Sequence, residues 1–370
     1  MNLKGQIKFV SKDKTLFFAT LKKRVDNYFI ENNLSKNANA EMVIKTIALL
    51  SMYLIPFLYL VLFNPTFGIS LLLWSIMGFG IAGIGMSVMH DANHGAYSKS
   101  KTVNLLMGHT INLAGGAVFN WKLQHNILHH TYTNIVHMDD DIDDKLVMRF
   151  SPHTNVKWYH KFQVVYAFLF YGILTLYWAL LKDLVQFIKY TQNGVNPNST
   201  KQNVIIFLQI TITKLFYLGV FLILPMYITD FTVGQIVLGF ILQHFIAGVV
   251  LTVIFQLAHT VENTTHPLPN EKGSIENEWA IHQLETTVDF SRDSKFLTWY
   301  LGGLNFQVEH HLFPKICHVH YPEVAKIVES TCKEFGVTYL VNETFGDAFS
   351  SHVRTLQRFG KLPDINEALA

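Results

Sequence analysis

The sequence predicts an all-α integral membrane protein with four transmembrane helices and a cytosolic helical cap that is rich in histidine. Half of its 370 residues are hydrophobic and the mean hydropathy is +0.23, above the apolar share usual for a soluble domain. Four segments are long enough to cross a bilayer, which takes about 20 apolar residues. Histidine is the third sign: the chain has 18, and eight of them stand in three clusters and at one isolated position near the ends of expected spans or in connectors.

The four expected spans come as two pairs. The turn NPTFG joins the first pair and the turn TD joins the second, and neither turn contains Lys or Arg. The N-terminal segment and the connector 94–203 contain many, so the turns are expected outside and the polar segments in the cytosol. The expected organisation is a cytosolic segment 1–45, a membrane domain 46–360 with spans 46–63, 69–89, 204–227 and 231–258, and a tail 361–370.

Two weaker apolar segments are not expected to span. Segment 103–119 is short and interrupted by glycine and polar residues, whereas 162–181 is long enough to cross. If the histidine clusters share one site, an odd number of crossings between His130 and His259 would put them on opposite faces. We therefore predict that 162–181 lies at the membrane interface, which leaves four spans.

Other patterns exclude or leave open further properties. GFGIAG at 78–83 matches a dinucleotide motif, but no strand precedes it, so close helix packing explains it better. A net charge of +2 without a basic stripe argues against a nucleic-acid partner. Two cysteines, Cys317 and Cys332, fit a reducing, cytosol-facing environment. A helix near 15–30 could lie on the membrane surface or form a solvated tail, and both readings stay open.

The histidines form three clusters and one isolated position. HDANH and HNILHH each contain a pair four residues apart, which lies on one face of a helix. QVEHH places a glutamine three and four residues before two adjacent histidines, and FQLAHT ends the fourth expected span. The residues are His90 and His94, then His125, His129 and His130, then Gln307, His310 and His311, and finally His259.

Eight imidazoles are too many for one tetrahedral zinc and suit two metal ions. Imidazole binds zinc, copper, iron and nickel, and the clusters contain no cysteine that would indicate an iron–sulfur site. A site beside lipid indicates a lipid substrate. Two irons next to a hydrocarbon chain indicate dioxygen activation and attack on an unactivated C–H bond, because no side chain can perform that step.

These motifs, in this order and with these gaps, resemble the histidine boxes of the membrane fatty-acid desaturases. The glutamine in the third box resembles the front-end group, which inserts a double bond on the carboxyl side of an existing one. WKLQHNILHHTYTNIVHMDDDID and HQLETTVDF, followed by WYLGGLNFQVEHHLFPKICHVHYPEVAKIV, are similar to that group, and the resemblance covers roughly residues 45–360. It implies a di-iron site, with O2 as co-substrate and the seven box histidines and His259 as ligands.

The role of Gln307 has two readings. Its carbonyl oxygen could bind iron weakly or hold a water that does, or the side chain could only hydrogen-bond a neighbouring ligand. Carboxylates close in sequence to the ligands are candidate hydrogen-bond partners of the imidazoles: Asp91, Glu262 and Glu309, with the Asp139–Asp144 run as a weaker candidate. Trp121, Trp299 and Tyr300 could line an acyl tunnel or anchor the protein at the interface.

The sequence also indicates partners and alternatives. No HPGG haem motif is present, so electrons are expected from a separate ferredoxin or cytochrome b5. The substrate is expected to be an acyl-CoA or acyl-lipid, in a bacterial inner membrane rather than the endoplasmic reticulum. A helix in HYPEVAKIVESTCKEFG, with Val324, Ile327, Val328 and Cys332 on its apolar face, is expected to cap the site. A lipid hydroxylase, a sphingolipid-type desaturase and, from another class, a metal transporter are the alternatives.

Overall fold

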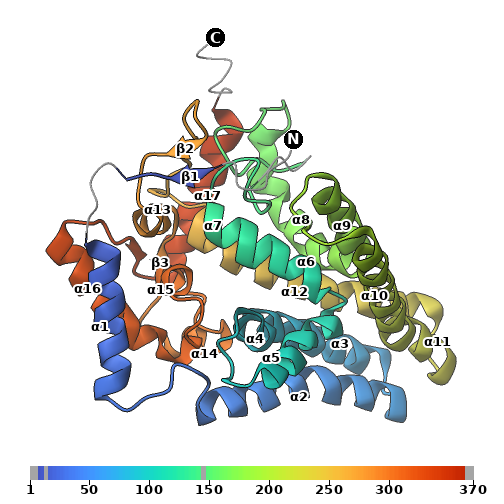
Figure 1. Ribbon diagram of the computed structural model, residues 1–370. Coiled ribbons are helices and arrows are strands. Elements are labelled where there is room, and N and C mark those ends of the chain that lie inside the picture. The colour runs from blue at the N-terminus through green and yellow to red at the C-terminus, as the bar shows by residue number, and fades with distance from the viewer. Residues whose placement is uncertain (1–6, 12–15, 143–146, 363–370) are drawn as a thin grey trace. The chain divides into compact units, whose positions relative to one another are not determined.

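A computed structural model describes residues 7–11, 16–142 and 147–362 (Figure 1). The chain divides into two compact units. Unit 1 contains Asn39–Leu123 and Phe168–Val253, and unit 2 contains the described parts of Asn2–Ala38, Gln124–Ala167 and Ile254–Ala370. Most of the expected C-terminal tail, as well as Asp143 and Asp144, lies outside the described residues.

The described chain contains five helices that are long and apolar enough to cross a membrane, one more than the sequence predicted. The additional one is His160–Gln192, where an interfacial helix was expected at 162–181, so length and composition do not confirm the count of four. The five are α2 (Ala40–Phe63); α3 (Phe67–Gly83) with η1 (Ile84–Val88) and α4 (Met89–His94); η4 (His160–Phe162) with α8 (Gln163–Tyr177), η5 (Trp178–Lys182) and α9 (Asp183–Gln192); α10 (Thr200–Leu218) with η6 (Gly219–Ile223) and α11 (Leu224–Ile228); and α12 (Val233–His259).

Glycines let the long helices of unit 1 approach each other closely. A Cβ atom on Gly80 of α3 would lie 3.0 Å from the backbone nitrogen of Tyr53 in α2, and one on Gly78 would lie 2.6 Å from the carbonyl oxygen of Gln243 in α12. Any side chain there would force the backbones apart. The GFGIAG motif therefore serves helix packing, as the sequence predicted.

Segment 103–119 does not form a span. It is broken into α5 (Lys101–Gly108), η2 (His109–Ala114) and α6 (Val118–Trp121). The break after η2 falls at Gly115, whose φ of +74° suits glycine, and its position is crowded by Ala179 and Tyr217.

Unit 2 is a set of short helices with two small parallel pairings. Strand β1 (Lys8–Phe9) pairs with β2 (Ser274–Ile275), and β3 (Asp289–Phe290) pairs with β4 (Val341–Asn342). Its further helices are α1 (Phe17–Glu31), α7 (His130–Tyr132), α13 (Trp279–Thr286), α14 (Lys295–Tyr300), α15 (Gln307–Leu312), η7 (His318–His320), α16 (Tyr321–Phe335) and α17 (Phe345–Lys361), and the π-helical segment η3 (Lys122–His129) leads into it from unit 1.

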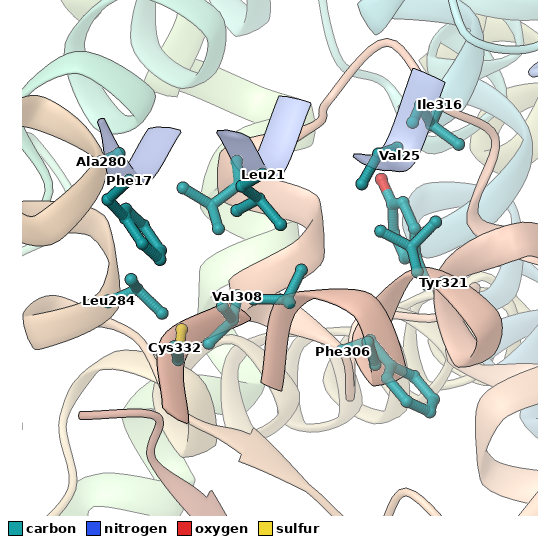
Figure 2. Packing of buried hydrophobic residues seen from close by; sticks show 14 of the residues in the cluster. Phe17, Leu21, Val25, Ala280, Leu284, Phe306, Val308, Ile316, Tyr321 and Cys332 are labelled. Atoms are coloured by element: carbon teal, nitrogen blue, oxygen red, sulfur yellow. The ribbon is translucent and has the colours of Figure 1, made fainter. Parts of the chain in front are cut away.

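The N-terminal helix α1 is part of the core of unit 2. Phe17, Leu21 and Val25, spaced four residues apart, are fully buried in a cluster that also contains Phe306 and Val308 at the start of the third histidine motif (Figure 2). The apolar face of α1 is thus used inside the protein, and neither reading made from the sequence, a membrane-surface helix or a solvated tail, describes it.

Helix α16 lies beside α1 and contributes five buried residues to this cluster (Figure 1). Pro322 stands in its first turn, and it ends at Gly336 with a φ of +65°. Val324, Val328 and Cys332 are buried on its inner face, as the sequence predicted, whereas Ile327 is only partly buried. Their spacing of four residues carries one apolar stripe along the helix.

Candidate metal centre

Three imidazoles converge in the interior of unit 2. His129 ends η3, His259 ends α12 and His311 lies in α15. Their ring centroids are 4.7 to 4.9 Å apart, and one nitrogen of each lies within 4.8 Å of the others. All three residues are buried, at 0 to 1% exposure. The Nε2 atoms of His129 and His259 have no hydrogen-bond partner among the described residues, an arrangement that a bound metal ion would explain.

The other nitrogen of each ring is bonded to an acceptor. His129 Nδ1–H donates to Asp139 Oδ2 at 3.0 Å, and His259 Nδ1–H donates to the carbonyl oxygen of Thr286 at 3.2 Å. His311 Nδ1–H donates to Gln283 Oε1 at 2.7 Å. Because a neutral imidazole carries one proton, each of these bonds leaves the Nε2 lone pair available, as metal-bound histidines require.

Asp139 is the strongest of these acceptors. Burial alone would lower the pKa of His129, but the adjacent Asp139 carboxylate outweighs burial and raises it. Burial would raise the pKa of Asp139, yet His129 and the backbone N–H groups of Asn134 and Asp141, 3.0 and 3.1 Å away, lower it. The carboxylate is therefore held as an anion. The neighbouring Asp141 is 3.9 Å from the same ring nitrogen and accepts a hydrogen bond from Gln124.

Three more box histidines of unit 2 adjoin this group. His125 Nε2 and His130 Nε2 are 3.2 Å apart. The ring of His130 is 4.6 Å from that of His310 and 4.5 Å from that of His311. Two nitrogens bound to one ion at about 2.1 Å lie about 3 Å apart when they are at right angles. The spacing of His125 and His130 therefore suits two neighbouring ligands of one ion.

The HDANH motif lies in unit 1. The π-helical turn η1 leads into α4, where the rings of His90 and His94 are 4.8 Å apart. Each ring meets that of Trp121 edge-on at 5.6 Å. Asp91 is buried, and its Oδ1 is 3.8 Å from His90 Nδ1. The pair thus has the common face expected from its spacing, with Trp121 beside it.

The structure places the remaining predicted site residues as follows. Gln307 begins α15 and is buried, one helical turn before His310 and His311. Glu309 is also buried, and its Oε1 accepts a hydrogen bond from the Tyr339 hydroxyl at 2.9 Å. Burial, together with the nearby Asp289 carboxylate, raises the pKa of Glu309.

Glu262 has a different partner from the one expected. Its carboxylate accepts bonds of 2.9 and 2.6 Å from the guanidinium of Arg354, and both side chains are about half exposed. The Nδ1 atom of His259 is bonded instead to the carbonyl of Thr286. Trp299 and Tyr300, in α14, are half-buried.

The hydrogen-bond partners Gln283, Thr286 and Tyr321 were not singled out from the sequence. Tyr321 Oη is 3.2 Å from His310 Nδ1. Gln283 and Thr286 lie three residues apart in α13, and they stand in a stretch that carried the family resemblance. No local spacing links Gln283 to His311, because 28 residues separate them; only the folded chain brings them together.

The donor set suits a metal centre built from imidazole nitrogens. Neutral imidazoles bind iron, zinc, copper and nickel, and the converging group contains no thiolate. The buried Nε2 atoms and the acceptors behind them are what such ions require. The residues of unit 2 therefore fit a histidine-bound metal.

Comparison with known proteins supports the same assignment. The family model described as fatty acid desaturase matches residues 65–342. The chain is 35% identical over 350 residues to an sn-1 linoleoyl-lipid 6-desaturase of Arthrospira platensis, covering 94% of each chain. It is 36% identical to the protein of the same name from Synechocystis sp., covering 96% of this chain and 98% of that one. It is 34% identical to an acyl-lipid (8-3)-desaturase of Physcomitrium patens, covering 96% of this chain and 74% of that one. The chain therefore belongs to the fatty acid desaturase family and is an oxidoreductase that desaturates fatty acyl chains.

Proposed function

We propose that this chain is a front-end acyl-lipid desaturase with a two-iron centre. The single observation that supports it most is the group of His129, His259 and His311, each with its Nδ1–H bonded and two with a bare buried Nε2. When bound, two irons supply dioxygen activation and removal of hydrogen from an unactivated C–H bond. The proposed ligands are His90, His94, His125, His129, His130, His259, His310 and His311, with Gln307 as a weaker ninth.

The chain's own residues hold and orient that centre. Asp139, Thr286 and Gln283 fix which ring nitrogen carries the proton, and the buried surroundings exclude water from the ligand nitrogens. The overall reaction removes two hydrogens from adjacent CH2 groups. With O2, two electrons and two protons, it yields one C=C bond and two waters. A separate ferredoxin or cytochrome b5 supplies the electrons.

The names of the relatives guide the proposed substrate. Two relatives are named linoleoyl-lipid 6-desaturases and a third an acyl-lipid (8-3)-desaturase. We therefore expect an acyl group on a membrane lipid rather than on CoA, and a new double bond near its carboxyl end. We place the protein in a bacterial inner membrane with its centre and termini in the cytosol.

Two contacts support four spans rather than five. The backbone N–H of Asp230 donates to Asn64 Oδ1 at 3.1 Å, so the turn after α2 and the turn after α11 lie together. If His160–Gln192 crossed the membrane as well, these turns would lie on opposite faces. The contact between His129 and His259 in unit 2 leads to the same conclusion. Three candidate helices separate these residues, and if all three crossed, the two histidines would lie on opposite faces of the membrane.

The packing of α8 and α9 in unit 1 indicates a bowed helix. A Cβ on Gly248 of α12, which is 11 residues before the end of the helix, would lie 2.5 Å from the Tyr171 carbonyl. Lys214, in the middle of Thr200–Ile228, forms an ion pair of 2.9 Å with Asp183. After Gln192 the chain turns back to the start of α10, where Asn196 hydrogen-bonds Asn203. Tyr171 and Asp183 thus both lie about 15 to 20 Å from the level at which α12 ends and α10 begins. Because α9 then returns to the start of α10, the helix bends back instead of continuing to the opposite face.

Product analysis in a desaturase-free host tests the function. Cells that express the chain and are fed linoleate should form a fatty acid with one more double bond, located by mass spectrometry towards the carboxyl end. His129→Ala should abolish the product and iron loading. His352→Ala is the matched control, because His352 is a buried histidine of unit 2 that hydrogen-bonds the carbonyl of Thr260. A hydroxylated product would support the hydroxylase alternative, and iron-replete, active His129→Ala would refute the ligand assignment.

A further inference from the structure

One uncharged side chain links two of the histidine motifs in unit 2. Gln283 of α13 is fully buried, and its Oε1 accepts a hydrogen bond from His311 Nδ1–H at 2.7 Å. The same oxygen is 2.9 Å from Thr133 Oγ1. Thr133 directly follows α7, and its hydroxyl is also 2.7 Å from the carbonyl oxygen of His129. Gln283 therefore connects the HNILHH segment to α15.

We propose that Gln283 is a positioning residue of the metal centre, which holds His311 with its proton on Nδ1 and ties its helix to the HNILHH segment. This inference rests on the proposed metal centre and names a residue that acts through a ligand. Gln283 Oε1 is an acceptor only, so the ring nitrogen that faces it must carry the proton. The lone pair of His311 is then on Nε2, on the ring that meets His129 and His259.

The geometry of the acceptor leaves His311 little freedom. His311, Gln283 and Thr133 are all buried at 0% exposure, so water cannot replace a lost acceptor. An imidazole without one could rotate, which would turn Nε2 away from the other two rings, or change tautomer, which would move the lone pair from Nε2 to Nδ1. Thr133 Oγ1 is itself 3.3 Å from His311 Nδ1, so the hydroxyl and the amide enclose the same ring nitrogen.

The three acceptors of this ligand group also differ in charge. His129 faces the Asp139 carboxylate, His259 faces a backbone carbonyl, and His311 faces a neutral amide. A carboxylate that accepts the imidazole N–H makes the other ring nitrogen a stronger electron donor to a bound metal than a neutral amide acceptor does. Gln283 therefore gives His311 a fixed orientation without adding a second buried anion. Glutamate at this position should keep the orientation and increase the electron density on the metal.

Three variants of the full-length enzyme in detergent test the proposal. Gln283→Leu keeps the approximate volume and removes the acceptor, whereas Gln283→Glu keeps the acceptor and adds charge. Gln163→Leu is the matched control. Gln163 is a buried glutamine of the same unit, and it hydrogen-bonds only the backbone of Arg149 and Leu356 among its described partners. Each protein is purified with iron and examined for iron per chain, for the rate of iron loss to a chelator and for its Mössbauer spectrum.

We expect Gln283→Leu to lose iron about 10- to 100-fold faster than the wild type, the usual effect of removing a partner of a metal-bound histidine. Gln283→Glu should retain iron and show an altered isomer shift or quadrupole splitting, and Gln163→Leu should match the wild type in all three readouts. If Gln283→Leu keeps iron as the wild type does, or if Gln163→Leu loses it equally fast, the positioning role is wrong. If the wild type binds no iron, the proposed centre itself fails, and the positioning role fails with it.

Discussion

The Oδ2 atom of Asp139 lies 3.0 Å from Nδ1 of His129, and both residues are buried at 0 to 1% exposure. The same carboxylate accepts backbone N–H groups from Asn134 and Asp141. Its position is therefore fixed by the loop that follows the second histidine motif. Asp139 orients His129 and remains an anion in the interior of unit 2, next to a site where a cation is proposed.

Removing that charge should weaken metal binding. We expect Asp139→Asn to lower iron affinity about 10- to 100-fold, measured by competition with a chelator. Asp141→Asn is the control, because Asp141 is 3.9 Å from the same nitrogen and should have a much smaller effect. Equal losses in the two variants would show that the general acidity of the loop, rather than the bond to His129, controls binding.

Helix α1 should be needed for the stability of unit 2. Leu21 is fully buried against α15 and α16, and we expect Leu21→Ala to lower the free energy of unfolding by about 2 to 5 kcal/mol. Thermal unfolding in detergent, followed by tryptophan fluorescence, measures the change. The neighbouring Lys22→Ala alters an exposed position and should be close to neutral. If Leu21→Ala unfolds at the wild-type temperature, α1 is not a structural part of the unit.

Buried neutral histidines should make unit 2 sensitive to acid. Burial lowers the pKa of His352 to about 4 from an ordinary value near 6.5. Between these values the unfolded chain binds more protons than the folded one, so stability falls as the pH drops from about 6.5 to 4. His352→Asn should flatten this part of the stability–pH curve, by on the order of 2 to 3 kcal/mol at pH 4. An unchanged slope would mean that His352 is protonated in the folded state.

Cysteine labelling should distinguish four spans from five. Cys317 and Cys332 are buried, so single introduced cysteines can be labelled against a low background. In intact cells, Thr66→Cys should react with an impermeant maleimide, and Lys201→Cys should react only after permeabilisation. Five crossings would instead expose Lys201→Cys to the outside, which the hydrogen bond between Asp230 and Asn64 opposes.

The sequence predicted the parts of this protein that depend on local pattern. Apolar runs located four long helices to within six residues at each end, and the i, i+4 spacing of His90 and His94 gave their common face. The spacing of three and four residues between apolar side chains likewise predicted the buried stripe of α16. These features depend on neighbours in sequence, so one chain is enough to read them.

Features that depend on distant residues could not be predicted in this way. The apolar face of α1 fits a membrane surface as well as a protein core, and only its packing against α16 decides between them. Gln283 has no spacing that marks it as a partner of His311. The helix His160–Gln192 is as apolar as a span, and the contacts of Lys214 and Gly248 are what argue that it bends back.

The packing of α1 on α16 has a consequence for biosynthesis. The first described helix to leave the ribosome buries Phe17 and Leu21 against Val328 and Cys332, which are translated about 300 residues later. Until then its apolar face has no lasting partner, and contacts between such remote residues form slowly. His310 and His311 also emerge late. The apolar face of α1 and the histidines of α15 can therefore reach their positions in unit 2 only after most of the chain has been translated.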